Sequence, residues 1–597
     1  MCNLYDIANY NWVSRQPPDH TTKTRSHGKN QLEVNNILES KVSKVAEIMN
    51  NYFIGKVQTI RNDMVESQED LTECSRLMRG KNCKLSLGHV TVETVRKLIK
   101  SLKSGKSTSV DNLDSFSVKL SADYIAEPVH HIITLSIFQN KFPTNWKYTK
   151  IIPLHKKLST LDPKNYRPVA ILSPLSKILE KIMFLQLYNY FTNNKLFHPS
   201  LHGYRKNRST QTALLQMYDR WVRAADQGHV SGVVLLDLSA AFDLVEPSIL
   251  TKKLSIYGVD SDFCNWIKSY LENRYQAVWI DHTFSSFVHN SIGVPQGSNL
   301  GPLFFLIYFN DLLSTLDCEV DVYADDSTIS ATRSTVAEIG TVLTNNCSKV
   351  SDWMLRNRFK FNAEKTHLLT VGTAERLRIT EQVVVHMNGV RLEESQNKCE
   401  LLLGVEMASN LKWKQQVSKV VGKLKTRLVG LNKIKFILPS PIRLTITTGI
   451  FNSVLVYCLP LFGGCTKEQI HDLQVLQNKA AQIVAHKPPF TSRKLLYDQI
   501  GWMTVSQLVV YHTLLMIFKI RKSGEPEYLA GFLLKESRTG RIMEPNIKLG
   551  LAQRSFCMRG SSHWNSLPPT VRNSVKLREF KLKLKPWITQ NIPRFLD

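Results

Sequence analysis

Two short apolar runs that each end in aspartate constrain this chain more than any other feature of its sequence. Four apolar residues at 233–236 precede Asp237, as expected of a strand that is buried on both faces. In VDVYADDSTI, residues 320–329, two strand-like runs flank Asp325 and Asp326, which predicts a hairpin with both aspartates at its tip. Because 88 residues separate Asp237 from Asp325, only tertiary structure can bring the three carboxylates together.

Each of these aspartates also has a purely structural explanation. A helix N-cap is the commonest role for an Asp placed like Asp237, and a solvated turn accounts for an Asp-Asp pair. Converging strand ends would instead form an oxygen-rich site for Mg²⁺, which prefers one or two protein carboxylates plus substrate phosphates and water. Two such ions activate a hydroxyl and stabilise the leaving oxygen of an in-line phosphoryl displacement. The pattern therefore indicates metal-dependent phosphoryl transfer.

The distribution of charge predicts a polyanionic partner. The chain has 597 residues and a formal net charge of +27. From Leu411 to Asp597 there are 30 Lys and Arg against 9 Asp and Glu, and no acidic residue lies between Met407 and Lys467. A segment of this length without acidic residues is better explained by binding to nucleic acid than by a basic surface that only keeps the protein soluble.

The cysteines and the apolar segments indicate an intracellular protein. The ten cysteines show neither C-x-x-C pairs nor zinc-ligand spacing, as expected of reduced thiols. The N-terminal residues lack the apolar core of a signal peptide, and the most apolar stretch, 446–464, is interrupted by Thr, Asn, Ser, Pro and Gly. We therefore expect no association with a membrane.

The order of sequence patterns along the chain predicts an α+β fold followed by helices. Residues 1–30 are polar and we expect them to be disordered, and an amphipathic helix is expected from about residue 37. From about 130 to 410, short strand-like runs alternate with helical ones. Residues 412–435 form a basic amphipathic helix whose apolar stripe consists of Val417, Val420, Val421, Leu424, Leu428 and Leu431.

Several motifs, in order, resemble those of a known family. LDLSAAFD, GVPQGSNLGPLFFLIYFNDL, YADD, FNAEKT and LLLGV resemble palm motifs A to E of reverse transcriptases. The upstream WKYTKIIPLHKK, DPKNYRPVAILSPLSKILEKI and LHGYRKNRSTQTALL are similar to the fingers motifs of non-LTR (LINE-type) retrotransposons, among them the jockey-like group.

The resemblance implies a right-hand polymerase with fingers, palm and thumb, followed by a basic helical C-terminal region. Residues 1–85 would be an N-terminal linker, partly disordered and containing the amphipathic helix. Residues 86–407 would form the fingers and palm, residues 408–470 a helical thumb, and residues 471–597 the basic C-terminal region.

The resemblance also implies a role for individual residues. The metal ligands would be Asp237, Asp325, Asp326 and the carbonyl of Leu238, the three aspartates being catalytic. Lys365 would neutralise the leaving pyrophosphate. The nucleotide-binding residues would be Arg167 and Lys156 at the triphosphate, Phe242 beneath the sugar, and Gln296 and Gly297 in a tight loop near the base pair. The nucleic-acid backbone would be contacted by Lys412, Lys419, Lys423 and Arg427.

The implied activity is RNA-templated DNA synthesis from a DNA 3′-hydroxyl with two Mg²⁺ ions, Mn²⁺ being the alternative. Template RNA, primer DNA and dNTPs would be the partners. Such elements generally carry an N-terminal endonuclease, which the 85 residues before the fingers cannot accommodate. We therefore expect a 5′-truncated element, a gene model that starts late, or an endonuclease supplied in trans. The protein would work in the nucleus at integration and reside in a cytoplasmic ribonucleoprotein before it. The alternatives are a decayed or domesticated copy that only binds nucleic acid, and a maturase or telomerase-type relative.

Overall fold

The computed structural model divides the chain into two units that each combine distant stretches of sequence. Unit 1 consists of Met1–Tyr204, Asp237–Asp317 and Ser348–Ala363, and unit 2 consists of Arg205–Leu236, Cys318–Cys347 and Glu364–Asp597. The structure describes residues 31–34, 37–64, 70–105, 107–156, 158–238, 240–290, 292–360, 365–395, 397–488, 490–538, 540–544 and 546–593. The expected disorder of residues 1–30 lies outside the described residues.

Unit 1 is built around a five-stranded sheet with the strand order β4-β3-β6-β7, in which β8 also pairs with β6. The strands are β3 (Tyr148–His155), β4 (Tyr166–Ile171), β6 (Arg274–Ile280), β7 (Thr283–Phe284) and β8 (Val288–Asn290). Helix α1 (Val42–Asn62) covers one face of this sheet, where Met49 packs with Ile151 and Val278. The amphipathic helix predicted from about residue 37 therefore exists but begins at Val42, after the hairpin of β1 (Leu32–Val34) and β2 (Ile37–Glu39).

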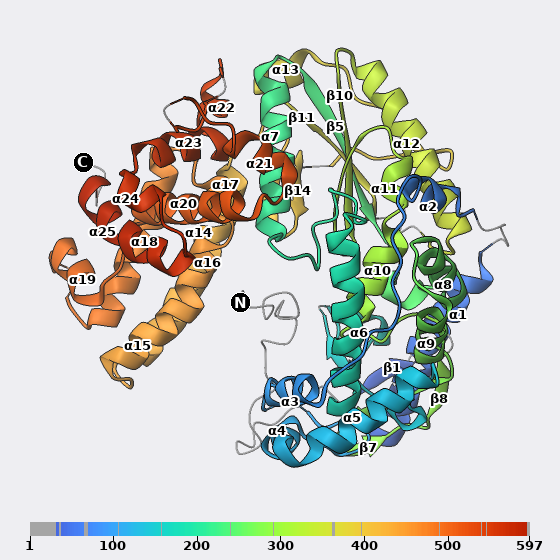
Figure 1. Cartoon of the computed structure of the whole chain (residues 1–597). Coiled ribbons are helices and arrows are strands. Elements are labelled where there is room, and N and C mark those ends of the chain that lie inside the picture. The colour runs from blue at the N-terminus through green and yellow to red at the C-terminus, as the bar shows by residue number, and fades with distance from the viewer. Residues whose placement is uncertain are drawn as a thin grey trace. The chain divides into compact units, whose positions relative to one another are not determined.

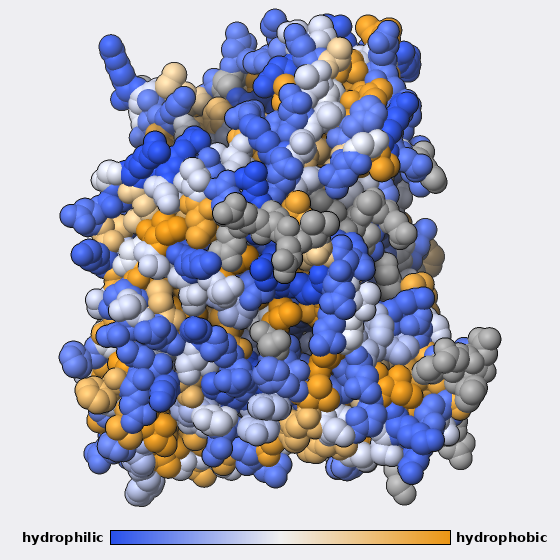
Figure 2. Space-filling view, turned by 90° about the vertical axis from the view of Figure 1, so that its right-hand side faces the viewer, coloured by the Kyte–Doolittle hydropathy of each residue, from blue (hydrophilic) through white to orange (hydrophobic). Residues whose placement is uncertain are grey.

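Helices form most of the remainder of unit 1 (Figure 1). They are α2 (Thr72–Leu77), α3 (Val92–Lys100), α4 (Ser115–Leu120), α5 (Ala122–Phe138), α6 (Pro174–Asn193), α8 (Pro247–Ile256), α9 (Ser261–Leu271), α10 (Gly301–Phe309) and α11 (Leu312–Thr315), with 3-10 turns at η2 (Thr144–Lys147), η3 (Pro163–Asn165) and η4 (Ala241–Leu244). Helix α10 is apolar all round and nearly all of its residues are buried, as expected of a central core helix. On the face of the molecule shown in Figure 2, hydrophobic residues form separate patches among hydrophilic ones.

Unit 2 contains a four-stranded sheet with the order β11-β5-β10-β9. Its strands are β5 (Val230–Asp237), β9 (Glu319–Tyr323), β10 (Asp326–Arg333) and β11 (His367–Val371). As the apolar run predicts, β5 lies in the interior of the sheet and is buried along almost all of its length. Helix α7 (Thr210–Asp226) packs against β9, and α12 (Val336–Arg356) continues from unit 2 into unit 1.

The rest of unit 2 is mainly helical. It comprises α13 (Ala374–Ile379), the hairpins β12 (His386–Met387) with β13 (Val390–Arg391) and β14 (Cys399–Leu402) with β15 (Val405–Ala408), then α14 (Lys414–Ile434), α15 (Ser440–Thr447), the π-helix η6 (Thr448–Asn452), α16 (Ser453–Val456), α17 (Leu459–Phe462), α18 (Lys467–Ala485), α19 (Arg493–Ile500), α20 (Val505–Ser523), α21 (Glu527–Leu533), α22 (Gly550–Gln553), α23 (Phe556–Ser566), α24 (Pro569–Arg572) and α25 (Leu577–Asn591).

Helix α20 is the centre of the C-terminal helices. It contacts α17, α18, α21, α23 and α25 (Figure 1). Among the described residues, one helical stretch, Arg493–Ser523, is long and apolar enough to cross a membrane, and more than half of its most apolar part is buried. The packing of α20 explains this composition, since a helix surrounded by others is apolar on most of its faces.

Candidate active site

The two aspartate-bearing segments belong to neighbouring strands, and Asp237 is the residue at which the chain passes from unit 2 into unit 1. Asp237 is the last residue of β5, and Asp326 is the first residue of β10, which lies beside β5. The hydroxyl groups of Ser231 and Thr332 lie 2.5 Å apart, which pairs the start of β5 with the end of β10. The strands are thus antiparallel, and the end of β5 adjoins the start of β10.

The helix N-cap explanation for Asp237 is wrong. The first helical turn after β5 is η4, whose N-cap residue is Ala240, with no side-chain cap hydrogen bond. Asp237 is half-buried, and the next residue, Leu238, is 6% exposed.

The tip of the hairpin differs by one residue from the sequence prediction. Tyr323 pairs with Asp326, so Ala324 and Asp325 form a two-residue turn and Asp326 opens β10. Ala324 has a φ of 59°, a left-handed conformation that alanine rarely adopts and that two-residue hairpin turns require at their first central position. The side chains of Asp325 and Asp326 are both exposed at this end of the sheet.

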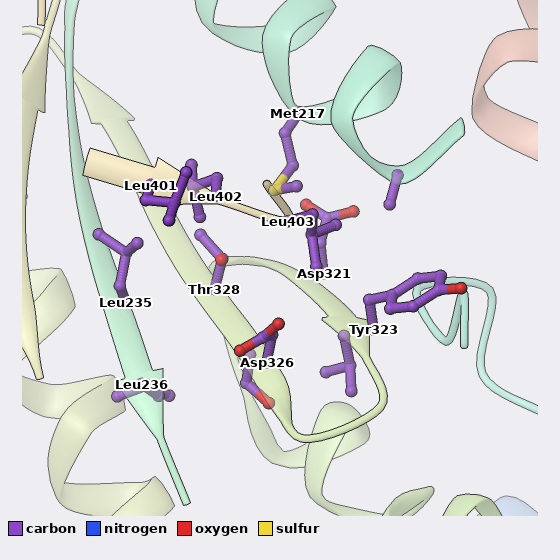
Figure 3. Close-up of a pocket in the computed structure, with 13 residues that line it drawn as sticks. Met217, Leu235, Leu236, Asp321, Tyr323, Asp326, Thr328, Leu401, Leu402 and Leu403 are labelled. Atoms are coloured by element: carbon purple, nitrogen blue, oxygen red, sulfur yellow. The ribbon is translucent and has the colours of Figure 1, made fainter. Parts of the chain in front are cut away.

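A pocket of unit 2 lies directly behind this hairpin (Figure 3). The hairpin lines it with Asp321, Tyr323, Asp326 and Thr328, which share one face, and also with Val322 and Ser327. It is also lined by Leu235 and Leu236 of β5, Ala213 and Met217 of α7, and Leu401, Leu402 and Leu403 of the LLLGV motif. The structure therefore brings three separate predicted motifs around one pocket.

The turn of the LLLGV motif is held by a hydrogen bond from the C-terminal helices. Leu403 and Gly404 both have positive φ, as a tight hairpin turn requires. The hydroxyl of Tyr457 donates to the carbonyl of Leu403 over 2.7 Å. This contact fixes a turn whose leucine lines the same pocket as Asp326.

The hairpin itself contains a buried carboxylate, Asp321, that the sequence motifs do not single out. Asp321 is 4% exposed, forms an ion pair with Arg220 of α7, and accepts a hydrogen bond of 3.0 Å from Gln216. The Arg220 guanidinium also pairs with Glu319 at 2.8 Å. The sequence does contain a signal, since Asp321 lies between two valines of a strand. A carboxylate in such a place is buried and requires a cationic or hydrogen-bonding partner.

The chemistry of the donor atoms fits a divalent cation. Within the described part of the chain, no group of three His, Cys, Asp or Glu side chains is arranged to hold a metal ion. Mg²⁺ needs only one or two protein carboxylates when substrate phosphates and water complete its shell, and the Asp325–Asp326 pair supplies two exposed carboxylates within unit 2. Lys365 is exposed and lies just before β11, in the same unit as the hairpin.

In unit 1, the predicted nucleotide-binding loop packs against the edge of β4. Gly297 has a φ of 125°, and a Cβ at this position would lie 2.5 Å from the carbonyl oxygen of Ala170. The amide N–H of Ala170 donates to the carbonyl of Gln296 over 2.7 Å. Both the close approach and the backbone conformation require glycine at this position.

The side chain of Gln296 is bound to a carboxylate that the sequence analysis had not singled out. Its Nε2 donates to Asp243 Oδ1 over 2.6 Å. Burial raises the pKa of the Asp243 carboxyl, and this hydrogen bond partly opposes the rise. Asp243 and Gln296 line a second pocket, within unit 1, together with Arg274 and Gln276 of β6.

Phe242 is half-buried between two aromatic rings of unit 1. Its ring lies 5.0 Å from that of Phe305 in α10, at an interplanar angle of 32°, and 6.2 Å from Tyr204 in an edge-on arrangement. The ring is therefore fixed in orientation yet partly accessible.

The predicted triphosphate cations lie on one hairpin of unit 1. Arg167 of β4 pairs with Leu154 of β3, and the backbone N–H of Lys156 donates to Asn165 over 2.8 Å. By strand alternation Lys156 and Arg167 share one face, and both side chains are exposed.

Helix α14 has the apolar stripe that the sequence predicts, with one exception among its cations. Val417, Val420, Leu424, Leu428 and Leu431 are buried, whereas Lys412, Lys423 and Arg427 are exposed. Lys419, which the resemblance groups with them as a contact to the nucleic-acid backbone, lies in a different environment. Its ammonium group pairs with Glu406 of β15 at 2.6 Å and is only one quarter exposed, because one turn of α14 passes beside β15.

Residues 154–418 match the model of the family "Reverse transcriptase (RNA-dependent DNA polymerase)". The chain is 26% identical over 461 residues to the "Probable RNA-directed DNA polymerase from transposon BS" of Drosophila melanogaster, covering 72% of this chain and 48% of that protein. It is 26% identical over 419 residues to the "RNA-directed DNA polymerase from mobile element jockey" of the same species, covering 68% of this chain and 45% of that protein.

A third relative is the "Probable RNA-directed DNA polymerase from transposon X-element" of Drosophila melanogaster, which is 24% identical over 392 residues, covering 62% of this chain and 41% of that protein. The chain spans about half the length of the curated relatives it matches. The motifs and these similarities agree: residues 154–418 match the reverse transcriptase family, and the chain is similar to RNA-directed DNA polymerases from the transposon BS and the mobile element jockey.

Proposed function

We propose that this chain is the polymerase of a non-LTR retrotransposon, which extends a DNA 3′-hydroxyl on an RNA template. The observation that carries the proposal is the strand order of the four-stranded sheet, in which β5, ending at Asp237, neighbours β10, which begins at Asp326 directly after Asp325 in the turn. Such an arrangement supports the binding of two divalent cations beside the phosphates of an incoming nucleotide.

The aspartates and one backbone carbonyl would hold the cations that nucleotidyl transfer requires. Asp237 and Asp325 would hold the two cations, with the carbonyl of Leu238 as a further oxygen ligand and Asp326 beside them. When bound, the cations would lower the pKa of the primer 3′-hydroxyl and neutralise charge on the transferred phosphate. Their identity is proposed to be Mg²⁺, with Mn²⁺ as the alternative.

Other residues would bind and orient the nucleotide. Arg167 and Lys156 supply two exposed positive charges on one face of the β3–β4 hairpin, which supports a role at the triphosphate. Phe242 would lie beneath the sugar, and Lys365 would neutralise the pyrophosphate as it leaves. Gln296 would exchange its bond to Asp243 for one to the nucleotide, while Gly297 keeps the loop close to β4.

The proposed partners are template RNA, a DNA primer and dNTPs. Lys412, which lies just before α14, and Lys423 and Arg427 within the helix are exposed, which supports contact with the phosphate backbone. We further propose that the protein acts in the nucleus at integration and resides in a cytoplasmic ribonucleoprotein before it.

Primer extension tests this proposal. Purified protein is incubated with dNTPs and a DNA primer annealed to an RNA template, with Mg²⁺, with Mn²⁺ or with EDTA. We expect extension that requires the cation and stops in EDTA. Binding of the primer–template without extension under every metal condition would contradict the proposal and favour a domesticated copy that only binds nucleic acid.

A further inference from the structure

Helix α5 of unit 1 carries apolar residues on two sides. Ala126, Val129 and Ile133 are buried along one side, and α5 contacts α3 and α4 (Figure 1). Tyr124 and Phe138 belong to the other side, where they are 87% and 84% exposed. A helix that is apolar on most of its sides is normally covered on those sides by other elements. The exposed side of α5 therefore indicates a partner that packs against it.

The exposed side follows a repeat of seven residues. Its mostly apolar residues are spaced alternately four and three positions apart, and all of them are exposed: Tyr124, Pro128, His131, Leu135 and Phe138. We name this row the α5 seam. The spacing is that of the a and d positions of a coiled coil, where the side chains of two helices interlock. The buried residues of α5 fall at the b and f positions of the same register, so the seam lies opposite the buried side.

The exposed apolar area is large enough for a stable interface. The adjoining helix α4 adds Phe116 and Leu120, which are 58% and 75% exposed. Because an aromatic side chain presents about 150 to 250 Å², α4 and α5 together expose roughly 600 Å² of apolar surface. Such an area is at the upper limit for one patch on a monomer. Two such surfaces in contact would bury about 1,200 Å², the lower limit for stable interfaces between proteins.

The charges beside the α5 seam favour a second copy of this chain as the partner. Glu127 flanks the first half of the seam, and Lys141 follows the last turn of α5; both are exposed. Within the described ranges neither side chain forms an ion pair, whereas the neighbouring Asp123 is paired with Lys100. In an antiparallel pair of α5 helices, the first half of one helix lies beside the end of the other. Glu127 of each copy then approaches Lys141 of the second copy, so the surface is complementary to itself, as two-fold symmetry requires.

We propose that this protein forms a two-fold symmetric homodimer in which the α5 seams of two copies pack antiparallel. This interface lies on unit 1 and goes beyond the proposed function, because it requires neither nucleotide nor metal. An apolar helix of a different protein is the competing partner for the same surface, and it would leave the purified chain monomeric.

Sedimentation equilibrium over a series of protein concentrations tests the proposal. The protein is treated with nuclease and washed at high salt during purification, because bound nucleic acid would link basic proteins to one another. Phe138→Glu places a charge in the seam, and Leu582→Glu is its matched control, since Leu582 of α25 is an apolar residue of unit 2 that is 68% exposed. Both replaced side chains are exposed, so the melting temperature should not change.

We expect the wild-type protein to be dimeric at micromolar concentration. Phe138→Glu should raise the dissociation constant of the dimer about a hundredfold or more, because a symmetric interface loses each contact twice. Leu582→Glu should leave the dissociation constant unchanged.

Exchange of charges tests the antiparallel arrangement. Glu127→Lys alone and Lys141→Glu alone should each weaken the dimer about tenfold, since like charges then meet at two places. In an equimolar mixture of these two variants, every pair in the mixed dimer again has opposite charges, so association should recover. A dimer that used another surface would not show this recovery.

A wild-type protein that is monomeric at every concentration would overturn the proposal and leave the seam to a protein of different sequence. A dimer that persists in Phe138→Glu would overturn it by placing the contact elsewhere. A mixture of Glu127→Lys and Lys141→Glu that dissociates as readily as the single variants would contradict the antiparallel pairing. None of these measurements depends on nucleotidyl transfer.

Discussion

At the scale of single residues, Phe242 has a defined ring position that makes a role as sugar gate testable. Phe305 and Tyr204 hold its ring, so shortening the side chain creates space without moving a strand. We expect Phe242→Ala to raise incorporation of ribonucleotides relative to deoxyribonucleotides, and Phe242→Val to do so less. The measurement is the ratio of kcat/KM for the two nucleotides. A lower melting temperature with an unchanged ratio would make Phe242 a core residue only.

The residues of the candidate site differ in how far the sequence predicts them. Asp237, Asp325 and Asp326 stand out because each interrupts an apolar strand pattern. The hydrogen bond from Gln296 to Asp243 was not predictable, since it joins a loop to a turn 53 residues away. The ion pair of Lys419 was missed for a similar reason: helical spacing shows which residues leave the apolar stripe, but not that Glu406 of a neighbouring strand lies within reach.

At the scale of elements, the exposed cations of α14 predict the salt dependence of nucleic-acid binding. Each phosphate contact contributes roughly 0.7 to 0.9 to the slope of log affinity against log salt. Replacing Lys412, Lys423 and Arg427 by Gln should therefore flatten that slope by about two to three units, with little change in melting temperature because all three are exposed.

Lys419→Gln is the matched control for this helix. It removes one positive charge from the same helix, but that charge is paired with Glu406. The slope should stay within about half a unit of the wild-type value. A slope that responds to Lys419→Gln as strongly as to the triple replacement would mean that total charge, rather than the exposed face of α14, determines binding.

Helix α7 connects the β9–β10 hairpin to the C-terminal helices. On one side Arg220 pairs with the buried Asp321 of β9, and its guanidinium lies 5.6 Å from the ring of Tyr528 in α21. Asp219 accepts a hydrogen bond of 3.1 Å from the Tyr528 hydroxyl, and Asp226 accepts one of 2.6 Å from the backbone N–H of Leu549. The C-terminal helices are therefore part of the framework that positions the hairpin.

This connection predicts a large cost for breaking the Arg220–Asp321 pair. Arg220→Leu leaves a buried carboxylate without its cation, which typically costs about 3 to 5 kcal/mol of unfolding free energy. Adding Asp321→Leu removes that unpaired charge and should recover much of the stability. Thermal and denaturant unfolding of the single and double variants measure this. A double variant that is less stable than Arg220→Leu alone would contradict the account.

At the scale of the whole molecule, two half-buried histidines predict how stability depends on pH. Burial lowers the pKa of His512 to about 4, assisted by Lys519 and Lys581, and burial lowers that of His563 to about 4, assisted by Arg559. In the unfolded chain these histidines bind a proton near pH 6.5, whereas in the folded protein they bind it only near pH 4. The contribution of the two histidines to stability is therefore fully present above pH 6.5 and is lost as the pH falls toward 4. Each histidine lowers the free energy of unfolding by at most about 1.4 kcal/mol for each pH unit of this fall.

Unfolding of the wild type and of His512→Gln at several pH values tests this. The variant should lose less stability than the wild type between pH 6.5 and 4. Identical pH dependence of the two proteins would show that His512 is protonated as readily in the folded state as in the unfolded chain.

The overall organisation was predictable where local patterns sufficed. The alternation of strands and helices, the buried character of β5 and the apolar stripe of α14 follow from periodicity. The division of the chain was not predictable, because residues 205–236 belong with the C-terminal helices rather than with the stretches on either side. Long-range contacts such as that of Arg208 with Glu525, 2.5 Å apart and 317 residues distant in sequence, produce this association and have no local signal.

The central claim is that the strand ends bearing Asp237 and Asp325 form the site of nucleotidyl transfer. The most direct measurement is single-turnover primer extension on an RNA template by Asp237→Asn and Asp325→Asn, with binding of the primer–template recorded in parallel. Asparagine keeps the shape of the side chain and removes its negative charge. The account predicts that both variants bind the primer–template like the wild type and that extension is lost. Extension at the wild-type rate in both variants would contradict it.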